Sequence, residues 1–173
     1  MPKPLTFLFA DDGAVPNHPV WPMLVYKATL DLKDSRDPEG EIEKLFADNG
    51  WGHGQWRNGI YPFAHYHSMI HEVLGVARGT ASVRFGGETG AVLDLEPGDV
   101  AVLPAGTGHQ RLSANAGLVV IGGYPPQGTY NLCRADNPAD RIAALKTISA
   151  VPNPASDPVA GRGGPLTAIW KSA

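Results

Sequence analysis

The sequence predicts an all-β fold whose architecture is a jelly roll, a barrel or a sandwich. Its 21 glycines and 16 prolines make up about a fifth of the 173 residues, against a usual share of roughly 12%. These turn formers separate short runs that are rich in β-branched and aromatic residues. Strands at such regular spacing are typical of antiparallel all-β domains and not of alternating strand–helix units.

The expected strands follow one another along most of the chain. We expect strands over Met23–Leu32, Gly59–His67, Glu72–Arg78, Thr80–Phe85, Ala91–Leu95, Val100–Pro104 and Leu118–Tyr124. The N-terminal apolar run 5–10 ends at Asp11 and Asp12. It is shorter than the roughly 7–15 apolar residues of a secretory signal, so an edge strand is the better interpretation.

Two short helices are expected beside the strands. Asp37-Pro38 and Asn137-Pro138 each offer an N-cap followed by proline at the first helical position. The first helix ends at Asn49-Gly50, and the second runs through Ile148. The last twenty or so residues are rich in proline and glycine and are expected to be extended, with Leu166, Ile169 and Trp170 docked on the core. We expect one domain over 1–173, with its core at about 59–124 and a C-terminal helix and tail at 137–173.

The composition excludes several classes of function. The net charge is −3 and the pI is about 6.0, which argues against binding to nucleic acid or to an anionic membrane surface. Apolar stretches fall short of the roughly 20 residues that would span a bilayer. The single cysteine, Cys133, rules out an intramolecular disulfide and favours a cytoplasmic location, and we expect a buried thiol without a catalytic role.

His65 and His67 form the first candidate pair of metal ligands. Residues two apart in a strand point to the same face, so both imidazoles converge on one side. The same alternation places Tyr61 and Phe63 on that face. The His-x-His pattern alone is equally well explained by surface placement.

Glu72 and His109 complete the candidate set. Glu72 opens an apolar strand, where a buried carboxylate needs a cation to offset its lost hydration. His109 follows the turn Pro-Ala-Gly-Thr-Gly at 104–108 and begins a new strand. Taken singly, each has a simpler explanation, an exposed glutamate at a strand end and a structural histidine.

Two longer patterns resemble the sequence motifs of the cupin superfamily. The stretch Gly59-(x5)-His65-x-His67-(x4)-Glu72-(x6)-Gly79 resembles the first cupin motif at every fixed position. The stretch Gly98-(x5)-Pro104-x-Gly106-(x2)-His109 resembles the second, except that Ser113 stands where the motif usually closes with asparagine. The motifs cover about a third of the chain, from Gly59 to Ser113.

This resemblance implies a double-stranded β-helix, which is a jelly-roll barrel, with one divalent metal ion held by His65, His67, Glu72 and His109. The donor set suits Fe(II), Mn(II), Ni(II), Co(II) or Zn(II). The resemblance also implies a homodimer and a small-molecule ligand.

Several other residues were weighed as parts of the site. Tyr61, Phe63 and Arg111 are candidates for the substrate pocket, Arg111 because it shares strand parity with His109, although an ion pair at the rim is a simpler role for it. His71 neighbours Glu72 and is expected to point the other way, as a surface or interface histidine. His53 is expected in a glycine-rich loop without a function. Trp51 and Trp56 are expected mainly in the core.

Three functions are consistent with these features. The first is a metal-dependent enzyme, of dioxygenase, isomerase or decarboxylase type, that acts on a small polar or acidic metabolite. The second is a non-catalytic module that binds a small molecule or the metal itself. The third, a structural protein without metal, would leave four polar side chains converging in an apolar barrel without a purpose.

Overall fold

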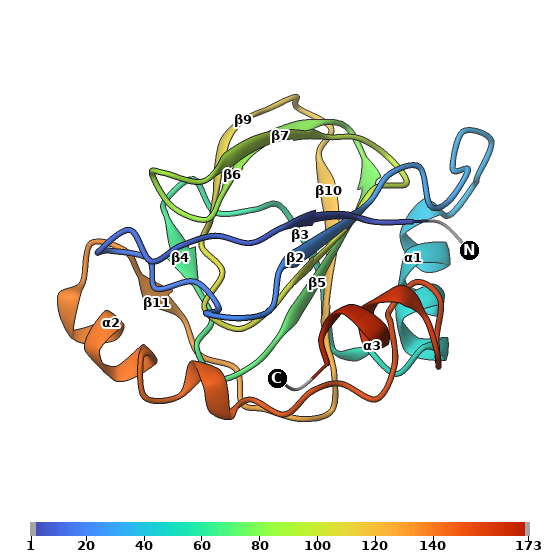
Figure 1. Cartoon of the computed structure of the whole chain (residues 1–173). Coiled ribbons are helices and arrows are strands. Elements are labelled where there is room, and N and C mark those ends of the chain that lie inside the picture. The colour runs from blue at the N-terminus through green and yellow to red at the C-terminus, as the bar shows by residue number, and fades with distance from the viewer. Residues whose placement is uncertain (1–2, 172–173) are drawn as a thin grey trace.

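The computed structural model describes residues 3–171 and confirms the predicted double-stranded β-helix (Figure 1). Its strands form two antiparallel sheets that face each other across a hydrophobic core. The six-stranded sheet has the order β1 (Leu5–Phe7), β2 (Met23–Tyr26), β8 (Val100–Leu103), β5 (Glu72–Arg78), β10 (Val119–Tyr124) and β3 (His53–Asn58). The five-stranded sheet has the order β11 (Cys133–Arg134), β4 (His65–Tyr66), β9 (His109–Ala114), β6 (Ala81–Phe85) and β7 (Ala91–Leu95).

Two of the predicted strands are shorter than expected. The run 59–67 forms a strand only at β4, because Pro62 has no N–H to donate to a ladder, and the residues before β4 turn away as a loop. The run that begins at Met23 ends at Tyr26, since Ala28 adopts a left-handed backbone (φ 48°) and donates its N–H to Asp99. β1 is confirmed as an edge strand paired with β2.

The four central strands of the six-stranded sheet are buried on both faces, whereas the edge strands β1 and β3 are largely exposed. In β2, Met23 and Val25 point into the core between the sheets, whereas Leu24 and Tyr26 point outward into a second apolar cluster. Helices cover that outer face, so a continuous apolar run replaces the alternation of a half-exposed strand.

Helix α1 (Pro38–Asp48) begins as predicted, with the Asp37 carboxylate accepting the Gly40 N–H at 3.0 Å. Its buried Ile42 and Phe46 rest on β5 and β10. Gly75 in β5 permits this close packing, because a Cβ there would lie 2.7 Å from Ile42 Cγ2.

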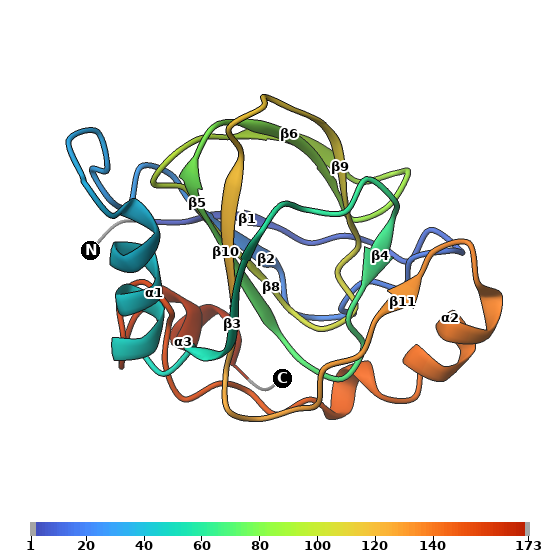
Figure 2. The same ribbon diagram turned by 180° about the vertical axis from the view of Figure 1, so that it is seen from behind.

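The C-terminal region differs from the expected single helix and extended tail. Helix α2 (Pro138–Ala144) ends before the short 3₁₀ helix η1 (Ile148–Ala150), and a third helix, α3 (Pro165–Ile169), follows in the tail. α3 lies beside α1 at one side of the barrel, and α2 lies at the other (Figures 1 and 2). Leu166 and Trp170 are fully buried, which confirms that the tail docks on the core. No helix within residues 3–171 is long and apolar enough to cross a bilayer.

A buried carboxylate, Asp157, ties the tail to the barrel. It accepts the backbone N–H groups of Val159 at 2.8 Å, Ala160 at 3.1 Å and Leu166 at 2.9 Å. The buried hydroxyl of Tyr26 in β2 also donates to it. These bonds turn the chain so that α3 meets the outer face of the six-stranded sheet.

Replacing Asp157 with alanine should therefore destabilise the protein by about 3–5 kcal/mol, because a buried hydrogen-bonded charge is removed and its donors are left unpaired. The exposed Asp136, paired only with Arg134 at the surface, is the matched control. Asp136→Ala should cost less than about 1 kcal/mol. Urea unfolding of both variants measures the difference, and equal losses would contradict the role of Asp157.

His18 and Trp21 form a second contact with the tail. The His18 Nδ1 atom accepts the Trp21 N–H at 2.8 Å, and the two rings stack at 4.5 Å between centroids. Trp21 stacks in turn on Trp170 at 5.6 Å. Burial lowers the pKa of His18 to about 4, so the folded protein holds this imidazole neutral.

This burial predicts a loss of stability in mild acid. As pH falls from about 6.5 toward 4, the unfolded chain gains a proton at His18 and the folded chain does not, so the free energy of unfolding decreases. His18→Asn keeps an acceptor for the Trp21 N–H but does not titrate. The variant should be less stable at neutral pH, because the ring stack is lost, and should lose less stability on acidification. Urea unfolding between about pH 7 and 4.5 tests this, and equal pH slopes would contradict it.

Candidate metal centre

Strand parity places Glu72 inside the barrel. Leu74 and Val76, which share its parity in β5, belong to the core between the sheets. Glu72 begins this strand and is 3% exposed. Its carboxylate therefore lies on the core side of the sheet, at the start of β5 and in line with the apolar side chains of Leu74 and Val76.

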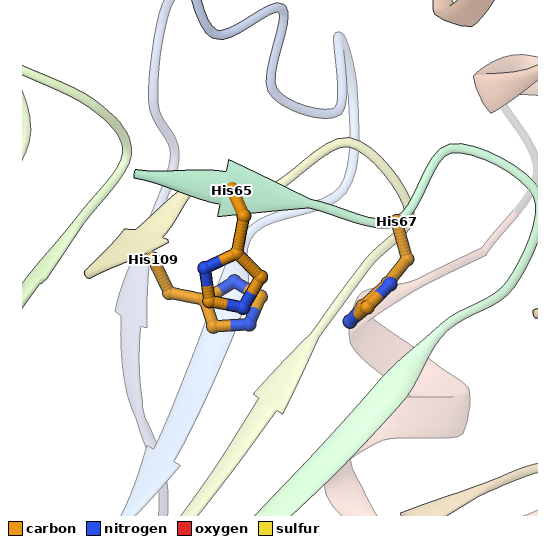
Figure 3. Close-up of side chains that lie close together, drawn as sticks. All are labelled: His65, His67 and His109. Carbon is orange, nitrogen blue, oxygen red and sulfur yellow. The ribbon is translucent and has the colours of Figure 1, made fainter. Parts of the chain in front are cut away.

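Three buried imidazoles face this carboxylate. His65 in β4 is paired directly with His109 in β9, and His67 follows one residue after the end of β4. One ring nitrogen of each lies within 4.8 Å of those of the other two (Figure 3). The structure thus brings together His65, His67 and His109 as one cluster of possible metal donors. Glu72 is not within the same mutual distance of all three, but it borders the cluster through His67 and His109.

Backbone carbonyls orient all three rings. The Nδ1 atoms lie 3.0 Å from the Phe63 carbonyl for His65, 2.5 Å from the Asn131 carbonyl for His67, and 3.1 Å from the Thr107 carbonyl for His109. Because a carbonyl only accepts, each Nδ1 carries the proton and donates it. Each Nε2 is left with a free lone pair, which is the arrangement of metal-binding histidines.

The Glu72 carboxylate divides its two oxygens between a protein donor and the histidines. Oε1 accepts the Tyr124 hydroxyl at 3.2 Å. Oε2 lies 3.3 Å from His67 Nε2 and 3.2 Å from His109 Nε2, yet it accepts no hydrogen bond from any described residue. A buried, unsatisfied carboxylate oxygen beside free imidazole lone pairs fits a divalent cation, which would satisfy all of these donors together.

The ionisation states agree with this role. Burial and the neighbouring His109 lower the pKa of His65 to about 3, so its ring is neutral at pH 7. Burial opposes ionisation of Glu72, but the adjacent His67 and His109 hold its pKa below the usual range. Against the effect of burial, Glu72 raises the pKa of His67. The carboxylate is therefore ionised and can act as a metal ligand.

The four donors open into a cavity of about 640 Å³. Apart from the donors, it is lined mainly by aromatic, aliphatic and glycine residues of β3, β5, β10 and the neighbouring loops. The lining residues are His53, Gly54, Trp56, Arg57, Asn58, Gly59, Ile60, Tyr61, Ile70, Leu74, Tyr124, Pro125, Pro126, Gly128 and Tyr130. This volume falls within the range of about 300–1,000 Å³ that holds small-molecule ligands.

The three predicted pocket residues lie in different places. Tyr61 lines the cavity, with its ring edge-on to His65 at 5.2 Å between centroids. Phe63 stacks on Tyr61 at 4.8 Å, and the Arg134 guanidinium lies 4.2 Å above it. Arg111 does not line this cavity but a neighbouring hollow, which Tyr61 and Pro62 also border.

Two other histidines differ from expectation. His71 does point away from Glu72, but it is fully buried instead of lying on the surface. Its Nδ1 accepts the Ala105 N–H at 2.9 Å and its Nε2 donates to the Pro152 carbonyl at 3.2 Å, because helices and tail cover that face of the sheet. His53 begins β3 instead of lying in a loop, and it lines the cavity.

Sequence reasoning missed the aromatic residues beside the carboxylate. Trp56 packs against the core as expected, but it also lines the cavity, and its Nε1–H donates to the Tyr124 hydroxyl at 2.9 Å. Gly122 makes room for the indole, since a Cβ there would lie 1.9 Å from the Trp56 ring. The parity of β10, with Val120 in the core, was a signal for Tyr124. Tyr130 lies in a loop, where strand parity gives no such signal.

Comparisons with known proteins place the chain beside one sequence relative. It is 40% identical over 165 residues to the uncharacterized protein YjlB of Bacillus subtilis strain 168, and the match covers 95% of each chain. No family model matches it.

Among solved structures, an acireductone dioxygenase from Bacillus anthracis, with a cadmium ion in its active centre, is 18% identical at a TM-score of 0.42, covering 61% of this chain and 80% of that one. A double-stranded β-helix protein from Klebsiella pneumoniae is 15% identical at 0.37, covering 79% and 80%. A DUF861 protein from Thermotoga maritima is 20% identical at 0.33, covering 59% and 96%. All three TM-scores are below 0.5, so the metal site is assigned from the side chains of this chain and not from these structures.

The geometry predicts that the purified protein holds roughly one transition-metal ion per chain. His67→Ala and His109→Ala should each lower the metal affinity by about 100-fold or more, because a ligand is lost. His53→Ala is the matched control, since this histidine lines the same cavity outside the cluster, and it should retain the metal. Elemental analysis of protein purified without added metal measures the content. Equal metal content in all four proteins would refute the assignment.

Proposed function

Because this chain belongs to the family of the Bacillus subtilis protein YjlB and is a cupin by motif and fold, we propose that it is a metal-dependent enzyme that acts on a small organic molecule. Its reaction would be of dioxygenase, isomerase or decarboxylase type. Action in the cytoplasm and assembly as a homodimer stay predictions.

One observation carries the proposal: the cluster of three histidines and the neighbouring Glu72 line a cavity large enough for a substrate. A purely structural metal site is closed on all sides by protein ligands, whereas a catalytic site leaves positions open. Here the donors border the cavity, so a bound molecule could reach the ion. A divalent ion held by His65, His67, Glu72 and His109 supplies Lewis acidity and, if it is Fe(II), redox chemistry with dioxygen.

The chain's own residues would hold this site in one arrangement. Carbonyl groups fix the three rings in the tautomer that presents Nε2. The Tyr124 hydroxyl holds Oε1 of Glu72 and is itself held by Trp56, so Oε2 faces the histidines. Ile70 and Leu74 add buried apolar side chains to the lining of the cavity. Such preorganisation favours catalysis because the polar groups need not rearrange during the reaction.

The enzyme proposal predicts turnover that depends on His109. Oxygen consumption by Fe(II)-loaded protein should be measured against diketones, phenols, thiols and organic acids, with mass spectrometry to detect isomerised or decarboxylated products. At least one compound should be converted, and His109→Ala should lower the rate by about 100-fold or more.

Leu112→Ala is the matched control, because Leu112 is exposed on the same strand, and it should leave the rate unchanged. If fully loaded wild-type protein converts none of the compounds but binds several of them, the protein is a non-catalytic binding module.

A further inference from the structure

The walls of the cavity have a different chemistry from its metal-binding end. Resting on the proposed function, we propose that the substrate is a flat, unsaturated molecule, aromatic or conjugated, that presents a phenol or enol oxygen to the metal. This narrows the small polar or acidic metabolite that the sequence suggested, and the aromatic rings, charges and size of the cavity each support it.

Aromatic rings lie beside two of the imidazoles. Tyr130 lies 5.0 Å from the His67 ring and 5.7 Å from the Tyr124 ring, between centroids. Tyr61 lies 5.2 Å from the His65 ring. Tyr61 and Tyr130 are 44% and 53% exposed, although both line the cavity. A flat ring packed against them would cover part of this exposed surface and gain the contacts that aromatic pairs favour.

The charges of the cavity accommodate one anionic oxygen. A divalent ion bound by the Glu72 carboxylate and the three histidines would carry one net positive charge, because ligating imidazoles are neutral and a ligating carboxylate is ionised. Arg57 is the one lysine or arginine among the described lining residues. Its guanidinium is already bound by both oxygens of Glu43, at 2.6 and 2.8 Å. If the substrate carried a carboxylate in addition to the oxygen bound to the metal, that carboxylate would have no cationic partner. This is unfavourable in a largely apolar cavity.

The size and the remaining walls favour the same class. A cavity of about 640 Å³ is much larger than a two- or three-carbon acid requires. Its lining includes the side chains of Ile60, Ile70 and Leu74, and Pro125 and Pro126 add further apolar surface. A ring or a conjugated chain would fill the cavity and contact this apolar lining, whereas a small acid would leave most of the cavity to water.

The test is calorimetric titration of the full-length Co(II)-loaded protein without oxygen. The probes are 4-nitrocatechol, a flat phenol, and malonate, a short dicarboxylate that also binds metals through two oxygens. We expect 4-nitrocatechol to bind about ten-fold more tightly than malonate or better.

Variants of Tyr130 separate the ring from the metal. Tyr130→Ala should weaken 4-nitrocatechol binding about ten-fold and leave malonate binding unchanged, whereas Tyr130→Phe, which keeps the ring, should resemble the wild type. Leu112→Ala controls for unspecific effects. Near-ultraviolet circular dichroism and the cobalt content establish that each variant is folded and loaded.

Two results would overturn the inference in distinguishable ways. If cobalt is retained but malonate binds as tightly as 4-nitrocatechol, or Tyr130→Ala changes neither affinity, the substrate class is wrong and the metal site stands. If the protein retains no cobalt, the proposed function fails together with the substrate class.

Discussion

The buried carboxylate of Glu72 is the constraint on which the functional part of this structure depends. An ionised carboxylate at 3% exposure is costly unless positive charge or donors surround it. In the barrel, the Tyr124 hydroxyl donates to one oxygen of Glu72, and His67 and His109 lie beside the other. Because these groups come from β5, β9, β10 and the segment after β4, the site exists only when both sheets are closed.

The same strand serves the site and the stability of the fold through alternation. Glu72 points into the barrel, and its neighbour His71 points to the outer face, where it meets the rings of Trp21 and Trp170. Both nitrogens of His71 are bonded to backbone, and burial together with His18 lowers its pKa to about 3. His71 is thus a neutral structural residue that joins β5 to the C-terminal tail. The tail therefore supports the strand that carries Glu72.

Much of the fold could be predicted, since the turn formers and the two motifs indicated the strands of the core and the double-stranded β-helix. Helix α1 was also predictable, because an N-cap and an apolar stripe are local signals at Asp37, Ile42 and Phe46. The tail was predicted less well. α3 is only five residues long and is stabilised by packing and by its hydrogen bond to Asp157. No local sequence pattern predicts these contacts. The prediction that His71 lies at the surface was wrong for a similar reason. Strand alternation predicts the direction in which a side chain points, but not which other segments cover that face of the sheet.

The sequence by itself determined which residues could converge as metal donors, because strand alternation and motif spacing are properties of the chain. Only the tertiary structure decided how those donors are held and what surrounds them. The carbonyls that orient His65 and His109 lie only two residues earlier, but the tautomer of His67 depends on the carbonyl of Asn131, 64 residues away. The aromatic walls combine β3, β10 and two loops, and the neutralisation of Arg57 depends on a glutamate of α1. Contacts between segments far apart in sequence arise from closure of the barrel, and a linear pattern carries no record of them.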